Sequence, residues 1–382
     1  MSDISTLVRG VVTRQSVTRR GENGAMTGTT APLRDLLDAI APPDAAAMEQ
    51  AVTQQAQLTK PPGSLGVLEA TSVSLAGIHG TCPPRALLRP VVAVFAGDHG
   101  VHAQGVSPWP QEVTAAMVSN VRAGGAAVNV LARQAGADVF VVDMGVAADL
   151  VPGPDLFGHK IRHGTSDLAV GPAMSREEAL VGLLAGAEVA DVLVDRGYDC
   201  LLTGDMGIAN TTPSAALIAA FAHVDPVLST GRGTGVDDPT LAIKVDVVRR
   251  ALRDRPVTDD PVTTLASLGG FEHAGIAGFI LGAAARRRPV ILDGVIAGAA
   301  ALVAQALCPH AVSYCFAGHR SAEPGHVLAL NHLALRPLVD LDLRLGEGTG
   351  AALAFPIVAA AGATLREMAT FDSAGVPRKG PA

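Results

Sequence analysis

The chain has 382 residues, 48% of them hydrophobic and 17% charged, and its formal net charge is −7. This composition is typical of a folded globular protein and not of a disordered chain, and the acidic balance argues against a nucleic-acid partner, which needs a basic surface. The four cysteines form no CxxC pair, so we expect neither a disulfide framework nor a zinc ribbon, and we expect a reducing, cytoplasmic location.

The N-terminal arm, residues 1–30, is polar and shows no periodicity, which predicts a disordered extension that can be removed. Its arginines faintly resemble a transit peptide, and an upstream start with Met26 as the functional one is the plainer alternative. No continuous apolar run indicates a secretory signal. The longest weakly polar stretch, residues 294–309, is shorter than the ~20 residues that cross a bilayer, so we expect a buried helix there and no membrane partner.

The sequence after the N-terminal arm predicts helices near both of its ends. Apolar residues recur at helical spacing from residue 33, a second helix is predicted over residues 44–58, and another over residues 350–368. The Pro- and Gly-rich residues 60–66 predict a turn. We expect one domain over residues 31–376, with a large α/β part over about 85–335, a small helical part from about 31–84 and 336–376, and a tail, residues 377–382.

Short, two-sided apolar runs in the middle of the chain predict buried parallel strands. Each is followed by Gly and Asp and then by a helical stretch; they cover residues 91–96, 139–142, 200–202 and 290–292. This order predicts an α/β fold, a Rossmann-like three-layer domain with a parallel sheet. Because ligands bind at the carboxyl ends of such strands, the polar motifs there predict one shared site.

Two motifs have the composition of a phosphate site. Residues 207–212, Gly-Ile-Ala-Asn-Thr-Thr, follow a strand and open a helix, so they either cap that helix or bind a phosphate or sugar. Residues 231–235, Gly-Arg-Gly-Thr-Gly, fit a phosphate loop or a structural turn equally well. The Gly-Asp-His-Gly segment at residues 97–100 lacks a matching ligand set elsewhere, so no metal is expected.

A carboxylate between glycines, Glu347, is the sharpest single feature. It lies in Arg-Leu-Gly-Glu-Gly-Thr-Gly, residues 344–350, just before an Ala-rich helix. A loop of this kind can approach a ligand closely, whereas the structural alternative is an acidic residue stabilised by the helix dipole.

These motifs together resemble the nicotinate-nucleotide–dimethylbenzimidazole phosphoribosyltransferase family, which builds the lower ligand of cobalamin. The similarity runs from about residue 33 to 376 and includes residues 60–66, 97–101, 105–107, 124–131, 204–212, 231–235, 321–326, 344–352 and 367–371. It implies transfer of the phosphoribosyl group of nicotinate mononucleotide to 5,6-dimethylbenzimidazole, which gives α-ribazole 5′-phosphate and nicotinate. It also implies a homodimer, small-molecule substrates and no cofactor.

The resemblance assigns roles to individual residues. Glu347 is implied as the general base that removes the benzimidazole proton. The nucleotide phosphate and ribose site is implied to comprise Gly207, Asn210, Thr211, Thr212, Gly231, Gly233, Lys244, Asp293 and Gly294. The benzimidazole side is implied to comprise Ser107, Asp205, Met206, Glu272 and Ser321.

Three positions depart from the family pattern. Asp205 stands where the family commonly has Glu, Ala209 replaces a usual Gly, and Trp109 replaces a smaller aromatic residue. They bear on which aromatic base is preferred and not on the reaction class. Two rival functions are a dinucleotide-dependent oxidoreductase, which lacks its strand–GxGxxG–helix unit here, and a non-catalytic binder, against which Glu347 argues.

Overall fold

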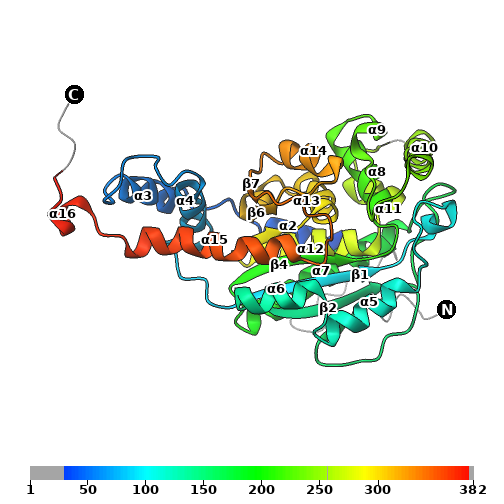
Figure 1. Cartoon of the computed structure of the whole chain (residues 1–382), viewed down its shortest axis with the longest axis horizontal. Coiled ribbons are helices and arrows are strands. Elements are labelled where there is room, and N and C mark those ends of the chain that lie inside the picture. The colour runs from blue at the N-terminus through cyan, green and yellow to red at the C-terminus, as the bar shows by residue number, and fades with distance from the viewer. Residues whose placement is uncertain (1–29, 256, 378–382) are drawn as a thin grey trace, which may run out of the picture.

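A seven-stranded parallel sheet forms the centre of the protein, in a computed structural model that describes residues 30–255 and 257–377. Its order is β3-β2-β1-β4-β5-β6-β7 (Figure 1). The strands are β1 (Pro90–Gly97), β2 (Asp138–Gly145), β3 (Leu156–Gly158), β4 (Cys200–Met206), β5 (Val290–Leu292), β6 (Cys315–His319) and β7 (Pro337–Val339). The expected α/β fold with a parallel sheet is therefore confirmed. The expected disordered arm, residues 1–30, lies almost entirely outside the described residues, as does most of the tail.

The four predicted strands correspond to β1, β2, β4 and β5. The first three extend further than predicted, because Gly and Asp residues of the motifs continue the ladder, with Asp205 paired to Phe95. Three strands, β3, β6 and β7, were not predicted from the sequence. Both β3 and β7 are three-residue edge strands with partly exposed residues, so they lack the buried apolar run by which strands were identified.

Helices cover both faces of the sheet (Figure 1). Against one face lie α12 (Phe271–Ala285) and α13 (Val295–Leu307), and against the other lie α5 (Val113–Arg122), α6 (Ala127–Ala135) and α15 (Thr349–Glu367). Further helices pack around them: α2 (Thr30–Asp38), α7 (Arg176–Asp195), α8 (Thr211–Ala222), α9 (Pro226–Ser229), α10 (Asp238–Asp254), α11 (Pro261–Leu268), α14 (Pro324–His332), and the 3₁₀ turns η1 (Gly100–Gln104) and η2 (Pro309–Tyr314).

A group of helices from both chain ends projects to one side of the sheet (Figure 1). It consists of α3 (Ala45–Gln55), α4 (Val67–His79), the end of α15 and α16 (Phe371–Ala374). Asp44 begins α3 as its N-cap by accepting a bond from the Ala47 N–H at 2.8 Å. A small apolar cluster, separate from the main core, joins these helices through Ala51, Leu58, Ala76 and Leu365.

One helix, α15, has the length predicted from the sequence, begins one residue earlier than predicted and is strongly apolar. It spans 19 residues and has the length and composition of a membrane-crossing helix. The stretch over residues 294–309 is therefore not the longest apolar one. Most of the apolar part of α15 is buried, and this helix packs against β4, β5, β6 and β7, which is the position of a core helix.

The order of the strands fixes where a ligand can bind. Chain connections run outward in opposite directions from β1 and β4, which are neighbours, and ligands of open α/β sheets bind at the carboxyl ends of the strands near such a point. The Gly-Asp-His-Gly segment follows β1, and residues 207–212 follow β4. The fold thus brings two predicted motifs, about 110 residues apart in the sequence, to one edge.

Candidate active site

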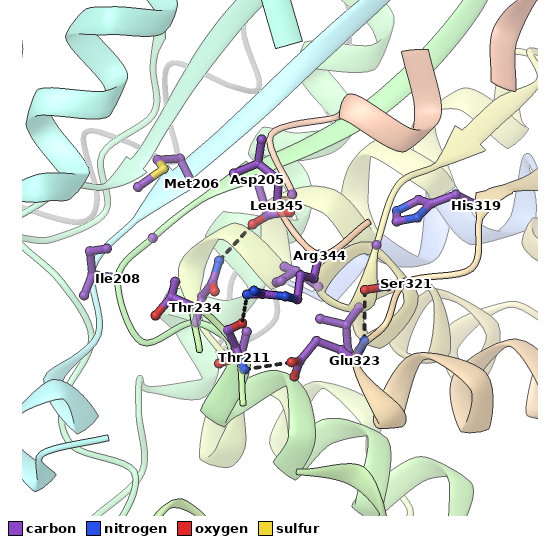
Figure 2. Close-up of a pocket in the computed structure, with 17 residues that line it drawn as sticks. Asp205, Met206, Ile208, Thr211, Thr234, His319, Ser321, Glu323, Arg344 and Leu345 are labelled. Carbon is purple, nitrogen blue, oxygen red and sulfur yellow. Dashed lines mark hydrogen bonds between the residues drawn. The ribbon is translucent and has the colours of Figure 1, made fainter. Parts of the chain in front are cut away.

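A pocket lies at the carboxyl ends of β4, β5 and β6 (Figure 2). In Figure 2, Thr211 and Glu323 lie toward one end, Asp205 and Leu345 toward the other, and Arg344 lies between them. The residues that line it are Asp205, Met206, Gly207, Ile208, Asn210, Thr211, Gly233, Thr234, Gly294, Val295, Ile296, His319, Ser321, Glu323, Arg344, Leu345 and Gly346.

The first turn of α8 forms one end of the pocket and carries the features of a phosphate site. The side chain of Lys244 is buried under it, with Nζ 3.0 Å from the Thr211 hydroxyl. Burial lowers the pKa of Lys244 to about 8, although the Glu323 carboxylate opposes that shift. Above this ammonium group lies Gly233, where a Cβ would come within 3.2 Å of Nζ. A cation, a helix N-terminus and a close backbone therefore meet at one place.

Glu323 supports the Gly-rich loop from the other side. Its Oε1 accepts a hydrogen bond from the Gly233 N–H at 2.7 Å. A Cβ at Gly231 would collide with the same carboxylate, so only glycine fits there. The hydroxyl of Thr212 is buried and has no hydrogen-bond partner among the described residues. Gly231, Thr212 and Lys244 thus lie behind the pocket wall and do not line it.

The loop before α15 places Glu347 behind the pocket, beside the start of α6. Glu347 has φ +64°, between Gly346 at +83° and Gly348 at +96°, so the turn is left-handed throughout. Its side chain is 4% exposed, and Oε2 accepts a bond from the Val128 N–H at 3.4 Å. Burial raises the pKa of Glu347 above its ordinary value, and the nearby Asp293 adds to this shift. Such a carboxylate is suited to accept a proton.

A second carboxylate, Asp205, faces the same turn from the end of β4. Its Oδ2 accepts a bond from the Asn210 side-chain amide at 2.9 Å, and Oδ1 is buried without a hydrogen-bond partner in the described chain. Burial, with repulsion from Asp293, raises the pKa of Asp205 well above its ordinary value. Asp205 therefore tends to keep its proton, and Glu347 lies close enough to contribute to that effect.

The structure brings many of the predicted site residues together. Those that line the pocket are Gly207, Asn210, Thr211, Gly233, Gly294, Asp205, Met206 and Ser321. Asp293 instead binds the main chain at the start of α15 through three N–H groups and is fully buried. Ser107 lies on the half-buried loop after η1, where its Oγ accepts a bond from the Trp109 N–H at 3.3 Å. Glu272 is fully buried against His99 and His273 and does not line the pocket.

Several residues of the pocket were not named as site residues from the sequence. Three of them, Glu323, Arg344 and Leu345, lie within motifs identified in the sequence, so membership of those motifs could have indicated them. His319 is 1% exposed, lines the pocket and has no hydrogen-bond partner for either ring nitrogen among the described residues. His319 is the last residue of β6, just as Asp205 lies near the end of β4. Because β6 was not predicted from the sequence, His319 was not predicted as a site residue. Within residues 30–255 and 257–377, no cluster of three or more His, Cys, Asp or Glu side chains has the arrangement of a metal site.

Comparison with known proteins identifies the family. A family model described as "Phosphoribosyltransferase" matches residues 40–376. A nicotinate-nucleotide–dimethylbenzimidazole phosphoribosyltransferase from Salinispora tropica is 59% identical over 89% of this chain and 98% of its own length. One of the same name from Chloroflexus aurantiacus is 53% identical over 91% of this chain and 99% of its own length.

A solved structure is similar over most of the chain. The crystal structure of the enzyme of that name from Thermus thermophilus superposes with a TM-score of 0.84 at 46% identity. The alignment covers 88% of this chain and all of the other. The seven-stranded fold, the pocket and these similarities agree with the resemblance seen in the sequence. The chain is therefore a member of the nicotinate-nucleotide–dimethylbenzimidazole phosphoribosyltransferase family.

Proposed function

We propose that this chain transfers the phosphoribosyl group of nicotinate mononucleotide to 5,6-dimethylbenzimidazole in the assembly of the cobalamin nucleotide loop, and releases nicotinate. The names of its relatives support the reaction. The observation that carries the proposal is the position of Glu347, whose buried carboxylate with a raised pKa lies on a loop that also lines the nucleotide pocket through Gly346 and Leu345.

The phosphate of the nucleotide binds at the start of α8 in this proposal. The positive end of the α8 dipole and the hydroxyl of Thr211 face the phosphate oxygens, and the Lys244 ammonium compensates their charge. The ribose then lies toward Gly294. The pocket holds C1′ in line between the leaving nicotinate and the attacking base, which supplies much of the rate by orientation.

The bonds and charges of the reaction match this site. A nitrogen of the benzimidazole attacks C1′ while the C1′–N bond to the pyridinium breaks, and the bonding pair leaves with the nicotinate nitrogen. That nitrogen loses its positive charge and needs no proton. The other benzimidazole nitrogen loses its proton to the Glu347 carboxylate. We assign Asp205, whose pKa burial and Asp293 raise, to the benzimidazole side, where its protonated form would act as a hydrogen-bond donor.

A product assay tests the proposal. Purified protein is incubated with nicotinate mononucleotide and a panel of benzimidazoles and phenols, and the products are identified by mass. We expect equimolar nicotinate and an α-ribazole phosphate. Nicotinate without a ribosylated base would indicate hydrolysis, and no release of nicotinate would overturn the proposal.

We also propose a cytoplasmic homodimer that needs no divalent metal. The resemblance to the family supports the dimer, and the pyridinium leaving group, already activated, supports metal-free chemistry. Light scattering of the eluting protein measures its mass. Turnover that is lost in EDTA and restored by adding one metal would contradict the proposal that the reaction needs no divalent metal.

A further inference from the structure

A chain of buried polar groups runs beneath the pocket floor. Oε1 of Glu272 lies 3.0 Å from Nε2 of His99 and 2.7 Å from Nδ1 of His273. Nε2 of His273 lies 2.8 Å from Oγ of Ser214, and that hydroxyl lies 2.8 Å from the main-chain oxygen of Asn210. We name His99, Glu272, His273 and Ser214 the Glu272 network. Each of these four side chains is 1% exposed or less.

The order of Ser214, His273 and Glu272 is that of a nucleophile, a base and an orienting acid. All three are 0% exposed, however, and none lines the pocket. No substrate reaches the Ser214 hydroxyl, so the arrangement does not serve covalent catalysis. Its function has to be exerted through the groups that it touches.

The network contains a buried charge. Burial by itself would raise the pKa of Glu272, but the flanking imidazoles of His99 and His273 hold it well below its ordinary value. The same carboxylate, with Asp98, raises the pKa of His99 against the effect of burial. A buried ion pair contributes little to net stability compared with an apolar core. It does fix the positions of its members, because an ion that moves away from its partner is left unpaired.

Both ends of the network touch the same turn, residues 207–210. On one side the turn lies on His99, because a Cβ at Gly207 would come within 3.3 Å of His99 Nε2. On the other side the carbonyl of Asn210 accepts the Ser214 N–H at 3.1 Å and, as a second bond, the Ser214 hydroxyl at 2.8 Å. The turn is strained, since Ala209 has φ +74°, a conformation that costs a residue with a Cβ about 1–2 kcal/mol. Strain of this kind persists where the surroundings hold it in place.

We propose that Glu272 is a positioning residue for nucleotide binding: through His99 and His273 it clamps residues 207–210 and so sets the start of α8 that receives the phosphate of nicotinate mononucleotide. The inference rests on the proposed function and deepens it. It gives Glu272 a role beneath the nucleotide and not, as the resemblance implied, against the benzimidazole.

The end of the network offers a matched pair of variants. Ser214 and Ser229 are both buried, and each donates to a carbonyl of the α8 region, Ser214 to Asn210 at 2.8 Å and Ser229 to Ala215 at 2.9 Å. Only Ser214 contacts His273. Ser214→Ala should raise KM for nicotinate mononucleotide up to about tenfold, the upper end of what one neutral hydrogen bond contributes. It should leave kcat and KM for dimethylbenzimidazole within about twofold, and Ser229→Ala should change none of the three.

Glu272→Gln removes the charge at constant size and should raise the same KM further, whereas Glu272→Asp, which keeps the charge, should restore part of the affinity. Calorimetric titration with nicotinate mononucleotide alone measures binding without turnover. Wild-type KM for the nucleotide in folded Ser214→Ala overturns the inference, and so does a Glu272→Gln effect confined to the base. If Glu272→Gln does not fold, the KM of Ser214→Ala for nicotinate mononucleotide tests the inference on its own. A wild-type protein that does not release nicotinate would contradict the proposed function instead, and the titrations would still test the network.

Discussion

The carboxylate of Asp293 holds the turn that carries Glu347. Oδ2 of Asp293 accepts the N–H of Gly348 at 3.1 Å, and Oδ1 accepts those of Gly350 at 2.7 Å and Ala351 at 3.1 Å. These are N–H groups at the start of α15 that no helical carbonyl can satisfy. One buried carboxylate at the end of β5 thus joins the sheet to the loop of the proposed base.

Asp293→Asn should loosen this turn. The amide nitrogen of Asn would face main-chain donors, so at least one buried N–H loses its acceptor, which costs about 1–3 kcal/mol. We expect a lower unfolding free energy in urea and a kcat at least about tenfold lower, because Glu347 is no longer held. A variant with unchanged kcat would show that the loop keeps its position without Asp293.

Lys244 should make nucleotide binding depend on pH. Its pKa of about 8 means that the ammonium charge is present below that pH and is lost above it. We therefore expect kcat/KM for nicotinate mononucleotide to fall as the pH rises through about 8. Lys244→Met should lower it at about pH 7 by about 10–100-fold, the equivalent of one charge-assisted hydrogen bond, and should abolish this step. A step that persists in Lys244→Met would belong to another group.

The sequence predicted the site best where chemistry and secondary structure coincide. Asn210 and Thr211 follow a clear buried strand, so parallel-sheet topology was enough to place them in the pocket. It could not predict the contact of Glu347 with Val128, residues separated by 219 positions, or the pairing of Glu272 with His99. Such contacts depend on how α6, α12 and α15 pack on the sheet, and no local pattern encodes that packing.

Ala209→Gly should stabilise the protein. The left-handed φ of +74° at Ala209 strains a residue with a Cβ and does not strain glycine, and the gain exceeds the added entropy of the unfolded chain. We expect about 0.5–1 kcal/mol more unfolding free energy in urea. Ala116→Gly, on the exposed side of α5, is the control and should lose about 1 kcal/mol. Destabilisation in both variants would mean that Ala209 makes contacts that outweigh its strain.

The ionisation of Asp205 should lower the unfolding free energy of the protein as the pH rises. Its pKa in the folded chain lies well above the ordinary value of 3.8, so the native state holds a proton that the unfolded state has released. The unfolding free energy therefore falls with rising pH from about that value upward. Asp205→Asn has no such proton, and its stability relative to wild type should be greater at about pH 8 than at about pH 5. Urea unfolding at both pH values measures the difference, in which the titrating groups that do not interact with Asp205 cancel.

Glu347→Gln should abolish most turnover with little effect on substrate affinity. The glutamine keeps the size of the side chain, but it cannot take the benzimidazole proton, and a positioned base contributes about 10²–10⁴-fold. We expect kcat to fall at least about 100-fold. Asp205→Asn, which changes the carboxylate that faces the same turn from the end of β4, is the comparison. A Glu347→Gln protein near the wild-type rate beside an inactive Asp205→Asn protein would transfer the role to Asp205. If both variants fold and both are inactive, the two carboxylates act together, as the effect of Glu347 on the pKa of Asp205 suggests.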